Sequence, residues 1–244
     1  MMLENNLIKQ CVCGNNFHFV RENINSLNVL KCINCSVIHQ ELVNWNITDY
    51  LEFYQNQYHD SYQDKKGVIS YHKRYEHDCK IADIRLSAYG DLLNANISGL
   101  DIGSSNSAFV HRARKKGISC LGLEPGNDIG DNEVTIRGTI ATTTLVPESF
   151  DFVTMHDSIE HIVDLNSEMK QVNKILKKDG LLIIDLPDYF SEHGRHHWKL
   201  IEHLWIFTKD NLKELLNLWG FTVFKIEVPI LGKFVFYARK NENI

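Results

Sequence analysis

The stretch that decides the fold is Leu100-Asp101-Ile102-Gly103-Ser104-Ser105-Asn106-Ser107-Ala108-Phe109. A short apolar strand ends here, a turn of small residues follows, and a helix begins. Ligands of open parallel sheets bind beyond the carboxyl ends of the strands, where small residues let the backbone approach them closely. The first N–H groups of a helix also attract a carboxylate. The stretch therefore predicts a ligand site in a doubly wound α/β fold.

Strand and helix patterns alternate from residue 81 onward, as expected of βαβ units. The run Leu181–Leu186 is continuously apolar, which is typical of a parallel strand covered on both faces. The last two strands, Phe221–Val228 and Lys233–Arg239, are joined by a connection too short for a crossover helix, so we expect them to be antiparallel. The other expected strands are Ser98–Ile102, Ile118–Glu124, Val134–Arg137 and Phe150–His156, and the expected helices are Asn106–Lys116, Asn166–Lys178 and the segment after Thr208.

Three features bear on the ligand. Glu124 ends the second strand about 20 residues after the turn, a spacing at which a carboxylate accepts hydrogen bonds from ribose hydroxyls. Asp101 stands where dinucleotide-binding folds usually have an apolar residue. The turn Gly103–Ser107 lacks the G-x-G-x-x-G that admits a pyrophosphate. A nucleoside without pyrophosphate is favoured, and an ordinary βα turn without a ligand is the alternative.

Residues 81–244 resemble the class I S-adenosylmethionine (SAM)-dependent methyltransferases, in the branch of ubiquinone-pathway and sugar-tailoring enzymes. The resemblance implies a Rossmann-like sheet of seven strands with a terminal antiparallel hairpin, and SAM as the methyl donor. The motifs that carry it, in the family's order, are Asp101–Ser107, Glu124-Pro125, Phe150-Asp151-Phe152-Val153 with Glu160-His161-Ile162, and Lys174–Leu182.

The resemblance also implies the cofactor contacts. Where the common first motif has two further glycines, this chain has Ser105 and Ser107, and serine disfavours positive φ. The expected contacts are Asp101, Gly103, Ser104 and Ser105 at the methionine end of SAM, and Glu124 and Pro125 at the ribose. Thr139 and Ile140 are expected at the adenine, and His156 and Asp157 at the sulfonium.

Methyl transfer to a hydroxyl needs a positioned acceptor and a base, and histidine is the usual base. His156 is the first candidate, with simple packing against the cofactor as its alternative. His193 and His203 lie in the segment that covers the acceptor pocket in this family, and solvated histidines of a surface lid are the alternative. His161 completes the candidate bases.

A divalent cation is a further expectation from the resemblance. The segment Asp157-x-x-Glu160-His161 resembles the Glu-x-x-Glu-His of ubiquinone-pathway O-methyltransferases, where it is associated with a divalent cation. Two carboxylates and an imidazole suit Mg²⁺ or a transition ion. A structural role for Glu160 and His161 is the alternative.

Four of the six cysteines lie near the N-terminus as two pairs, Cys11-x-Cys13 and Cys32-x₂-Cys35. Paired thiolates at this spacing predict a structural zinc ribbon. The first pair is one residue shorter than usual, so recruitment of His18 or His39, or four free thiols, are the alternatives. The isolated cysteines at positions 79 and 120 are typical of core packing.

The composition divides the chain into a zinc-ribbon-like module at 1–45, an aromatic-rich linker or cap at 46–80, and a methyltransferase domain at 81–244. We expect the aromatic side chains of the linker to cover the open side of the cofactor pocket, with stacking on sugars or bases as the alternative. These side chains are Tyr50, Phe53, Tyr54, Tyr58, Tyr62, Tyr71 and Tyr75.

The net charge of −5 argues against a nucleic-acid partner. No apolar run long enough for a membrane span and no secretory signal occur, so we expect a cytoplasmic protein. The motif variant, the ribbon and the histidine-rich segment favour O-methylation of a sugar, nucleotide sugar or glycan component in carbohydrate biosynthesis. The alternatives are an RNA methyltransferase, such as one acting on ribosomal RNA, and a non-catalytic module with the SAM-binding fold.

Overall fold

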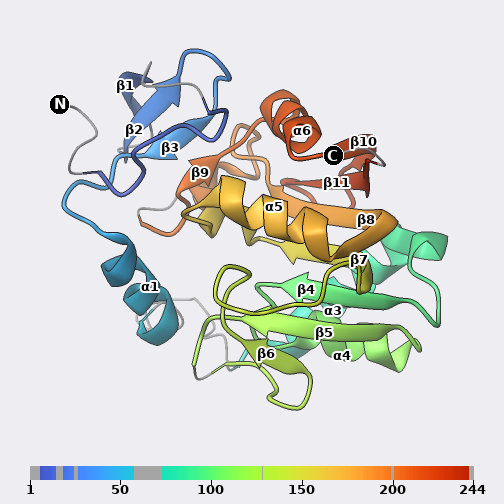
Figure 1. Ribbon diagram of the computed structural model, residues 1–244. Helices are drawn as coiled ribbons and strands as arrows, with labels where there is room; N and C mark the ends of the chain where they lie inside the picture. Colours follow the sequence, from blue (N-terminus) through green and yellow to red (C-terminus); the bar gives the residue numbers. More distant parts are fainter. Residues whose placement is uncertain are drawn as a thin grey trace.

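The computed structural model describes residues 6–14, 19–24, 27–57, 73–127, 129–198 and 201–241 (Figure 1). His18 and the linker tyrosines Tyr58, Tyr62 and Tyr71 lie outside these ranges. The strands are β1 Phe19–Ile24, β2 Leu27–Cys32, β3 Ile38–Gln40, β4 Ser98–Ile102, β5 Ser119–Glu124, β6 Thr135–Arg137, β7 Phe150–His156, β8 Leu176–Pro187, β9 Trp205–Ile206, β10 Phe221–Glu227 and β11 Lys233–Lys240. The helices are α1 Ile47–Asn56, α3 Tyr75–Tyr89, α4 Ala108–Lys115, α5 Leu165–Ile175 and α6 Lys209–Leu218, with 3₁₀ turns η1 Gly90–Leu92, η2 Ile159–His161 and η3 Arg195–His197.

The larger sheet has seven strands in the order β10-β11-β8-β7-β4-β5-β6. Strands β8, β7, β4, β5 and β6 run parallel, while β11 is antiparallel to both of its neighbours. The Rossmann-like sheet with a terminal antiparallel hairpin is therefore confirmed.

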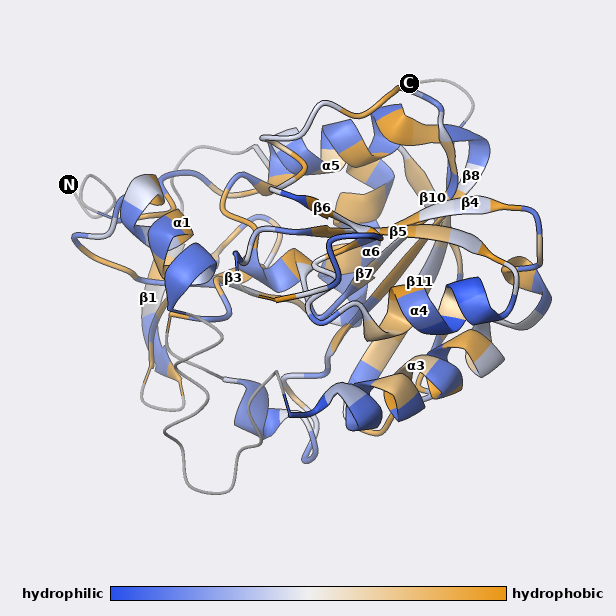
Figure 2. Cartoon of the chain, turned by 90° about the horizontal axis from the view of Figure 1, so that it is seen from below, coloured by the Kyte–Doolittle hydropathy of each residue, from blue (hydrophilic) through white to orange (hydrophobic). Residues whose placement is uncertain are grey.

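Two apolar clusters cover the two faces of this sheet. Helices α5 and α6 pack on one face, where Met169 and Leu216 meet strand residues such as Val153. Helices α3 and α4 pack on the other, where Leu86 and Val110 belong to one cluster with strand residues. Figure 2 shows the apolar strands between α5 on one side and α3 and α4 on the other. Burial on both faces explains why the strands are continuously apolar.

Local sequence sets where the helices begin. Thr208 and Asn211 form a reciprocal capping box at α6, and the side chain of Asp164 caps α5. Helix α4 begins at Ala108, two residues later than predicted, because Ser107 before it is left-handed. Helix α3 was not expected, and it crosses the predicted boundary between residues 80 and 81.

The smaller sheet joins distant parts of the chain. Its order is β1-β2-β3-β9, so the N-terminal module takes its fourth strand from the segment after β8 (Figure 1). The register pairs Ile38 with Ile206 and His39 with Trp205. The N-terminal module is thereby attached to the segment that precedes α6. Among the described residues, no helix is long and apolar enough to cross a membrane.

Candidate active site

The turn after β4 and the end of β5 meet at the carboxyl edge of the larger sheet. One carboxylate oxygen of Glu124 accepts from the backbone N–H of Ser105 at 2.7 Å. The other oxygen accepts from the N–H of Gly126 at 2.8 Å. Glu124 is buried, so these bonds fix a carboxylate beside the small-residue turn. The fold thus brings together the two motifs from which the sequence predicted a nucleoside site.

The turn has the backbone shape of a glycine-rich loop. Gly103 has φ of 76°, and a Cβ added there would lie 2.7 Å from the Cβ of Ser158. Ser105 and Ser107 are also left-handed, with φ of 48° and 63°. The Ser107 hydroxyl offsets its strain, since it bonds the Thr135 hydroxyl at 2.8 Å and accepts from a backbone N–H.

Asp101, His156 and Tyr89 form a buried hydrogen-bonded chain. Nδ1 of His156 donates to the Asp101 carboxylate at 2.9 Å, and the Thr154 hydroxyl donates to the same oxygen at 2.8 Å. Burial raises the pKa of Tyr89, which keeps its proton for Nε2 of His156, 2.8 Å away. Both ring nitrogens of His156 are thus engaged, which favours a role in positioning Asp101 over a role as base.

The residues expected to contact adenine lie at the same edge. Gly138, directly before Thr139, donates its N–H to the carbonyl of Glu124 at 3.0 Å. Thr139 itself forms a hydrogen-bonded turn with Thr142, and Ile140 is buried. Pro125 is half-buried beside Glu124.

Polar groups at this edge fit the methionine end of SAM. The hydroxyls of Ser104, Ser105 and Ser158 are buried without a hydrogen-bond partner among the described residues. Buried polar groups normally have partners, so unsatisfied ones beside a glycine turn indicate a polar ligand. The amino, carboxylate and ribose groups of SAM offer such partners.

Asp157 is held by cations of the protein. Its carboxylate bonds Arg85 at 3.2 Å and also bonds Lys233. Burial opposes its ionisation, but these two cations outweigh burial and lower the pKa of Asp157. Arg85 also bonds the fully buried Asp185 at 2.7 Å. Asp157 is not part of the group of side chains that lie close enough together to share an ion, so the structure does not bring the expected cation set of Asp157, Glu160 and His161 together.

The cluster that does form consists of Glu160, His161 and His203, with potential ligand atoms all within 4.8 Å of one another. Burial, and then the charge of Asp157, raises the pKa of Glu160 to about 8. Tyr54 bonds His161 and the carbonyl of Glu202, so the linker aromatics reach this cluster.

Two further residues, the remaining candidate base His193 and Tyr189, lie on the segment after β8. His193 is exposed and lies against the turn at Gly232, so the fold does not bring it to the cluster. The Tyr189 hydroxyl bonds Nδ1 of His203 at 3.0 Å. The sequence analysis did not single out Tyr189; its place two residues after an apolar strand was the available signal.

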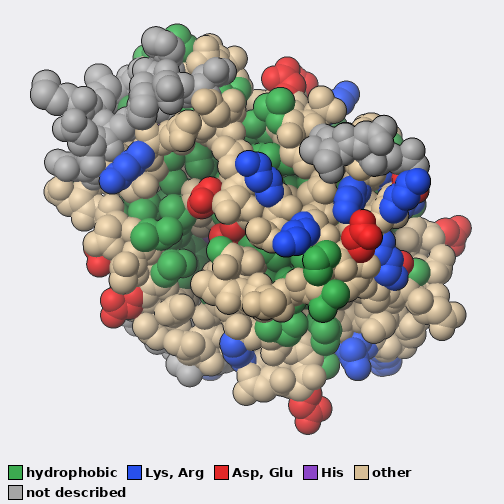
Figure 3. Space-filling view, viewed as in Figure 1, with side chains coloured by type: hydrophobic (Ala, Val, Ile, Leu, Met, Phe, Trp, Pro, Cys, Tyr) green, Lys and Arg blue, Asp and Glu red, His purple; other side chains and the backbone are tan. Residues whose placement is uncertain are grey.

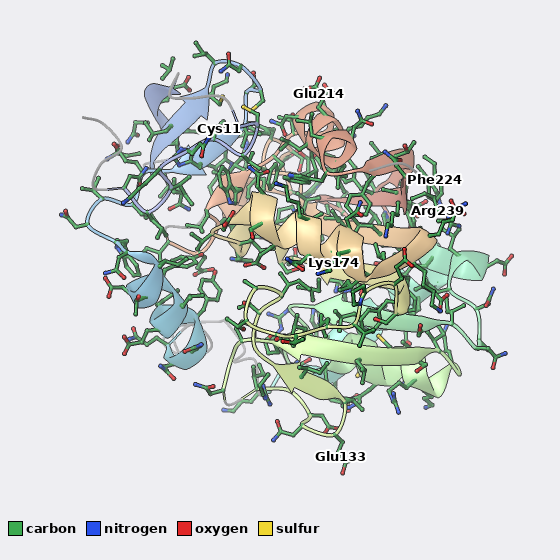
Figure 4. All side chains as sticks on the ribbon, viewed as in Figure 1. Cys11, Glu133, Lys174, Glu214, Phe224 and Arg239 are labelled. Carbon is green, nitrogen blue, oxygen red and sulfur yellow. The ribbon has the colours of Figure 1, made fainter. Side chains whose placement is uncertain are left out.

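The four N-terminal cysteines converge; Figure 4 labels one of them, Cys11, in the N-terminal module. Sγ of Cys11 lies 3.5 Å from those of Cys35 and Cys13, and Cys13 lies 3.8 Å from Cys32. A tetrahedral zinc with Zn–S bonds near 2.3 Å spaces its sulfurs about 3.8 Å apart. Hydrogen bonding to Cys11 lowers the pKa of Cys35 to about 5. The cluster fits a structural zinc ion.

His39 does not belong to the cysteine cluster. It is buried, its Nδ1 lies 3.0 Å from the carbonyl of Gln40, and its ring packs against Trp205. Among the described residues, the four cysteines alone make up the group at this site.

Comparison with known proteins agrees with this geometry. A family model described as "Methyltransferase domain" matches residues 71–226, more than half of the chain. No curated protein sequence matches this chain. A SAM-dependent methyltransferase of Thermotoga maritima, described as a possible histamine N-methyltransferase, is 21% identical and has a TM-score of 0.55 over 70% of this chain and 95% of that chain.

Two further solved structures share the fold. A SAM-dependent methyltransferase of Archaeoglobus fulgidus is 15% identical, with a TM-score of 0.56 over 70% of this chain and 98% of that chain. The 1,6-didemethyltoxoflavin-N1-methyltransferase of Burkholderia thailandensis, solved with its acceptor and S-adenosylhomocysteine, is 14% identical, with a TM-score of 0.62 over 91% of this chain and 99% of that chain. With its sheet order, its glycine turn beside Glu124 and the matching family model, the chain belongs to the class I SAM-dependent methyltransferases.

Proposed function

We propose that this methyltransferase transfers the methyl group of SAM to a hydroxyl of a sugar, a nucleotide sugar or a glycan component. The observation that carries the proposal is the pairing of two neighbouring polar sites. One is the turn beside Glu124, and the other is the cluster of Glu160, His161 and His203. A cofactor at the first site and a hydroxylated acceptor at the second bring methyl and oxygen together.

The protein's part in this reaction is mainly positioning. In this proposal Asp101, held by His156, would bind the amino end of SAM, and Glu124 would bind the ribose. The acceptor oxygen attacks the methyl carbon, the electron pair of the C–S bond stays on sulfur, and the hydroxyl proton passes to a base or to water. S-adenosylhomocysteine and the methyl ether are the products.

The surface charge supports a small acceptor rather than RNA. The net charge is −5. On the face seen in Figure 3, basic and acidic side chains are interspersed instead of forming one basic stripe. RNA-binding surfaces need clustered cations, because their affinity comes largely from phosphate neutralisation.

The cysteine cluster supports a second part of the proposal, that residues Cys11, Cys13, Cys32 and Cys35 bind a structural zinc ion. A four-thiolate site has no open position, so zinc would stabilise the N-terminal module and take no part in chemistry. We propose a cytoplasmic location on the same grounds, since thiolates stay reduced there.

The first test is calorimetric titration with S-adenosylhomocysteine. We expect micromolar binding, and Glu124→Gln should weaken it at least about tenfold, because a charged hydrogen-bond acceptor is lost. Glu133→Gln is the matched control, because Glu133 is exposed on the loop before β6, as labelled in Figure 4. Absence of binding by the unaltered protein would reinstate the non-catalytic alternative.

The second test is transfer of labelled methyl from SAM to a panel of sugars, nucleotide sugars and glycan fragments. We expect label in a base-stable methyl ether of at least one of them. Binding of S-adenosylhomocysteine together with no transfer to any carbohydrate would overturn the acceptor class and leave the family unchanged.

A further inference from the structure

A hollow of about 290 Å³ lies beside helix α1 and the chain that leads into it. Six side chains line it, and they form three pairs of one kind each: two aromatic rings, two carboxylates and two carboxamides. They are Trp45 and Phe53, Asp49 and Glu52, and Asn44 and Gln57. Ligand cavities in proteins usually begin at about 300 Å³, so this hollow is large enough for one small ring and its substituents.

The aromatic rings of the hollow belong to a closely packed cluster. The ring of Trp45 meets that of Phe53 edge-on, with centroids 6.2 Å apart and planes at 88°. Trp45 also packs edge-on against Tyr50, and Phe53 packs edge-on against Tyr54. Trp45 and Phe53 are half-buried, whereas the four polar side chains are exposed. Because the rings are already held in place, a ligand that packs on them loses little free energy to their ordering.

The polar side chains of the hollow match hydroxyl groups. Carboxylates accept hydrogen bonds, while carboxamides both donate and accept them. A hydroxyl also donates and accepts, so a set of neighbouring hydroxyls can pair with all four side chains. The Asn46 side chain donates to the Asp49 carboxylate at 2.7 Å and accepts from the Asp49 backbone N–H at 3.0 Å. Asp49 is therefore held at the start of α1, with further carboxylate lone pairs left for a ligand.

The charge of the hollow restricts its ligand. Asp49 and Glu52 line it, and none of the described residues that line it is Lys, Arg or His. Phosphate and carboxylate groups would be repelled there, because like charges at close range oppose binding. The aromatic wall needs an apolar surface, and the polar wall needs hydroxyls. A neutral sugar ring has both, with C–H groups on its faces and hydroxyls around its rim.

Helix α1 connects the hollow to both parts of the proposed active site. The hydroxyl of Tyr54, the residue after Phe53, bonds Nδ1 of His161 at 2.5 Å. Near the C-terminal end of α1, a backbone carbonyl accepts from the N–H of Asn127 at 3.3 Å. Asn127 lies on the loop that follows Glu124. One helix therefore lines the hollow, contacts the acceptor cluster and reaches the loop beside the cofactor turn.

We propose that this hollow is a remote subsite that binds one neutral sugar unit of a glycan acceptor. The inference rests on the proposed function: another unit of the same glycan presents its hydroxyl at the cluster of Glu160, His161 and His203. Binding of the remote unit adds the same free energy before and during methyl transfer, so it lowers KM and leaves kcat unchanged. The hollow thus favours an uncharged glycan over a nucleotide sugar, whose phosphates it would repel.

Saturation-transfer NMR with cellotriose, maltotriose and triacetylchitotriose tests binding without any methyl transfer. We expect at least one of these neutral trisaccharides to bind the unaltered protein at millimolar concentration. Phe53→Leu and Glu52→Gln should each weaken its binding at least about fivefold, because a ring face or a charged hydrogen-bond acceptor is lost. The negatively charged trigalacturonate should not bind.

Matched controls lie at exposed positions that do not line the hollow. Phe224 is 49% exposed on β10, and Glu133 is exposed on the loop before β6; Figure 4 labels both. Phe224→Leu and Glu133→Gln should keep the trisaccharide affinity of the unaltered protein. The absence of saturation transfer to every neutral trisaccharide would overturn the proposal. Equal weakening by a variant and its control, or binding of trigalacturonate as tight as that of a neutral trisaccharide, would do the same.

Transfer kinetics separate the subsite from the proposed function. For a trisaccharide that the unaltered protein methylates, Phe53→Leu should raise KM at least about fivefold with kcat unchanged, and KM for the corresponding monosaccharide should stay the same. An equal change for both acceptors would overturn the subsite and keep the acceptor class. Trisaccharide binding that depends on Phe53 and Glu52, together with no transfer to any carbohydrate, would overturn the proposed function and keep the subsite. Every variant should bind S-adenosylhomocysteine as the unaltered protein does, which shows that it is folded.

Discussion

Two serines in the cofactor turn have the same backbone conformation but different partners. Ser105 and Ser107 are both left-handed, and among the described residues the hydroxyl of Ser107 has bonding partners while that of Ser105 has none. Glycine relieves left-handed strain of about 1–2 kcal/mol but is more flexible in the unfolded chain. We expect Ser105→Gly to raise the free energy of unfolding by up to about 1 kcal/mol. Ser107→Gly should lower it by about 1–2 kcal/mol, because two hydrogen bonds are lost.

Urea unfolding of the ligand-free protein measures both values. Destabilisation by Ser105→Gly would mean that its hydroxyl has a structural role that the described contacts do not contain. Equal changes in the free energy of unfolding for the two substitutions would mean that backbone strain alone, and not hydrogen bonding, determines their effect.

Arg85 lies between Asp157, which directly follows β7, and Asp185 of the neighbouring strand β8. It bonds Asp185, whose side chain is fully buried, and Asp157. Removing one partner of a buried pair leaves an uncompensated charge, so we expect Arg85→Met to cost about 3–5 kcal/mol. Arg112→Met is the control: Arg112 pairs with Asp83 at the surface, and its loss should change the melting temperature little. Similar melting temperatures for the two variants would contradict this reasoning.

Helix α5 carries a carboxyl group whose surroundings oppose its charge. Burial, and then Asp164, raises the pKa of Glu168 to about 7. The raised pKa means that the folded protein binds this proton more tightly than the unfolded chain does. The resulting stability is complete below pH 4.5 and is lost as the pH rises through 7.

We therefore expect Glu168→Gln to be more stable than the unaltered protein at pH 8, and equally stable at pH 4. A shift of this size corresponds to roughly 3 kcal/mol, and the partial exposure of Glu168 reduces the expected gain to about 2 kcal/mol. Urea unfolding at the two pH values measures it. An equal gain in the free energy of unfolding at pH 8 and at pH 4 would mean that packing, and not charge, causes the difference between Glu168→Gln and the unaltered protein.

Elements with a clear local pattern could be predicted from the sequence. The strand, turn and acid around Asp101, Gly103 and Glu124 follow from apolar runs and small residues. Helix α3 was missed although its buried residues Ala82, Leu86 and Tyr89 have helical spacing, because polar residues between them hide the apolar face. Tyr89, the hydrogen-bond partner of His156, lies on this helix and was therefore missed as well. Strand β9 has two residues, too few for any periodic pattern.

At the scale of the whole molecule, long-range contacts attach the N-terminal module to the segment before α6. The side-chain amide of Gln40 donates to the carbonyl of His203 at 2.7 Å. The backbone N–H of Ile201 donates to the side-chain oxygen of Gln40 at 3.0 Å. The Trp205 indole donates to the carbonyl of Ile162 at 2.7 Å. These pairs are up to 163 residues apart, so no local pattern could reveal them. The cysteine cluster and the segment before α6 therefore belong to one structural unit.

This arrangement predicts that loss of the proposed zinc ion from the cysteine cluster loosens the segment 201–206 and spares the turn beside Glu124. In Cys32→Ser we expect faster hydrogen exchange of β3 and of residues 201–206, because β9 pairs with β3 and Gln40 holds the chain before it. Exchange in β4 should be unchanged, since the larger sheet does not include the module. Cys79→Ser, outside the cluster, should alter neither.

The same variant separates two ways in which the module could act. If it only orders the segment 201–206, affinity for S-adenosylhomocysteine should stay within about twofold while transfer to an acceptor falls, because the cofactor groups around Glu124 lie on the larger sheet. A parallel loss of S-adenosylhomocysteine affinity and faster exchange in β4 would contradict this expectation. The module would then support the whole fold, and the carboxyl edge of the larger sheet would depend on the cysteine cluster as much as the segment 201–206 does.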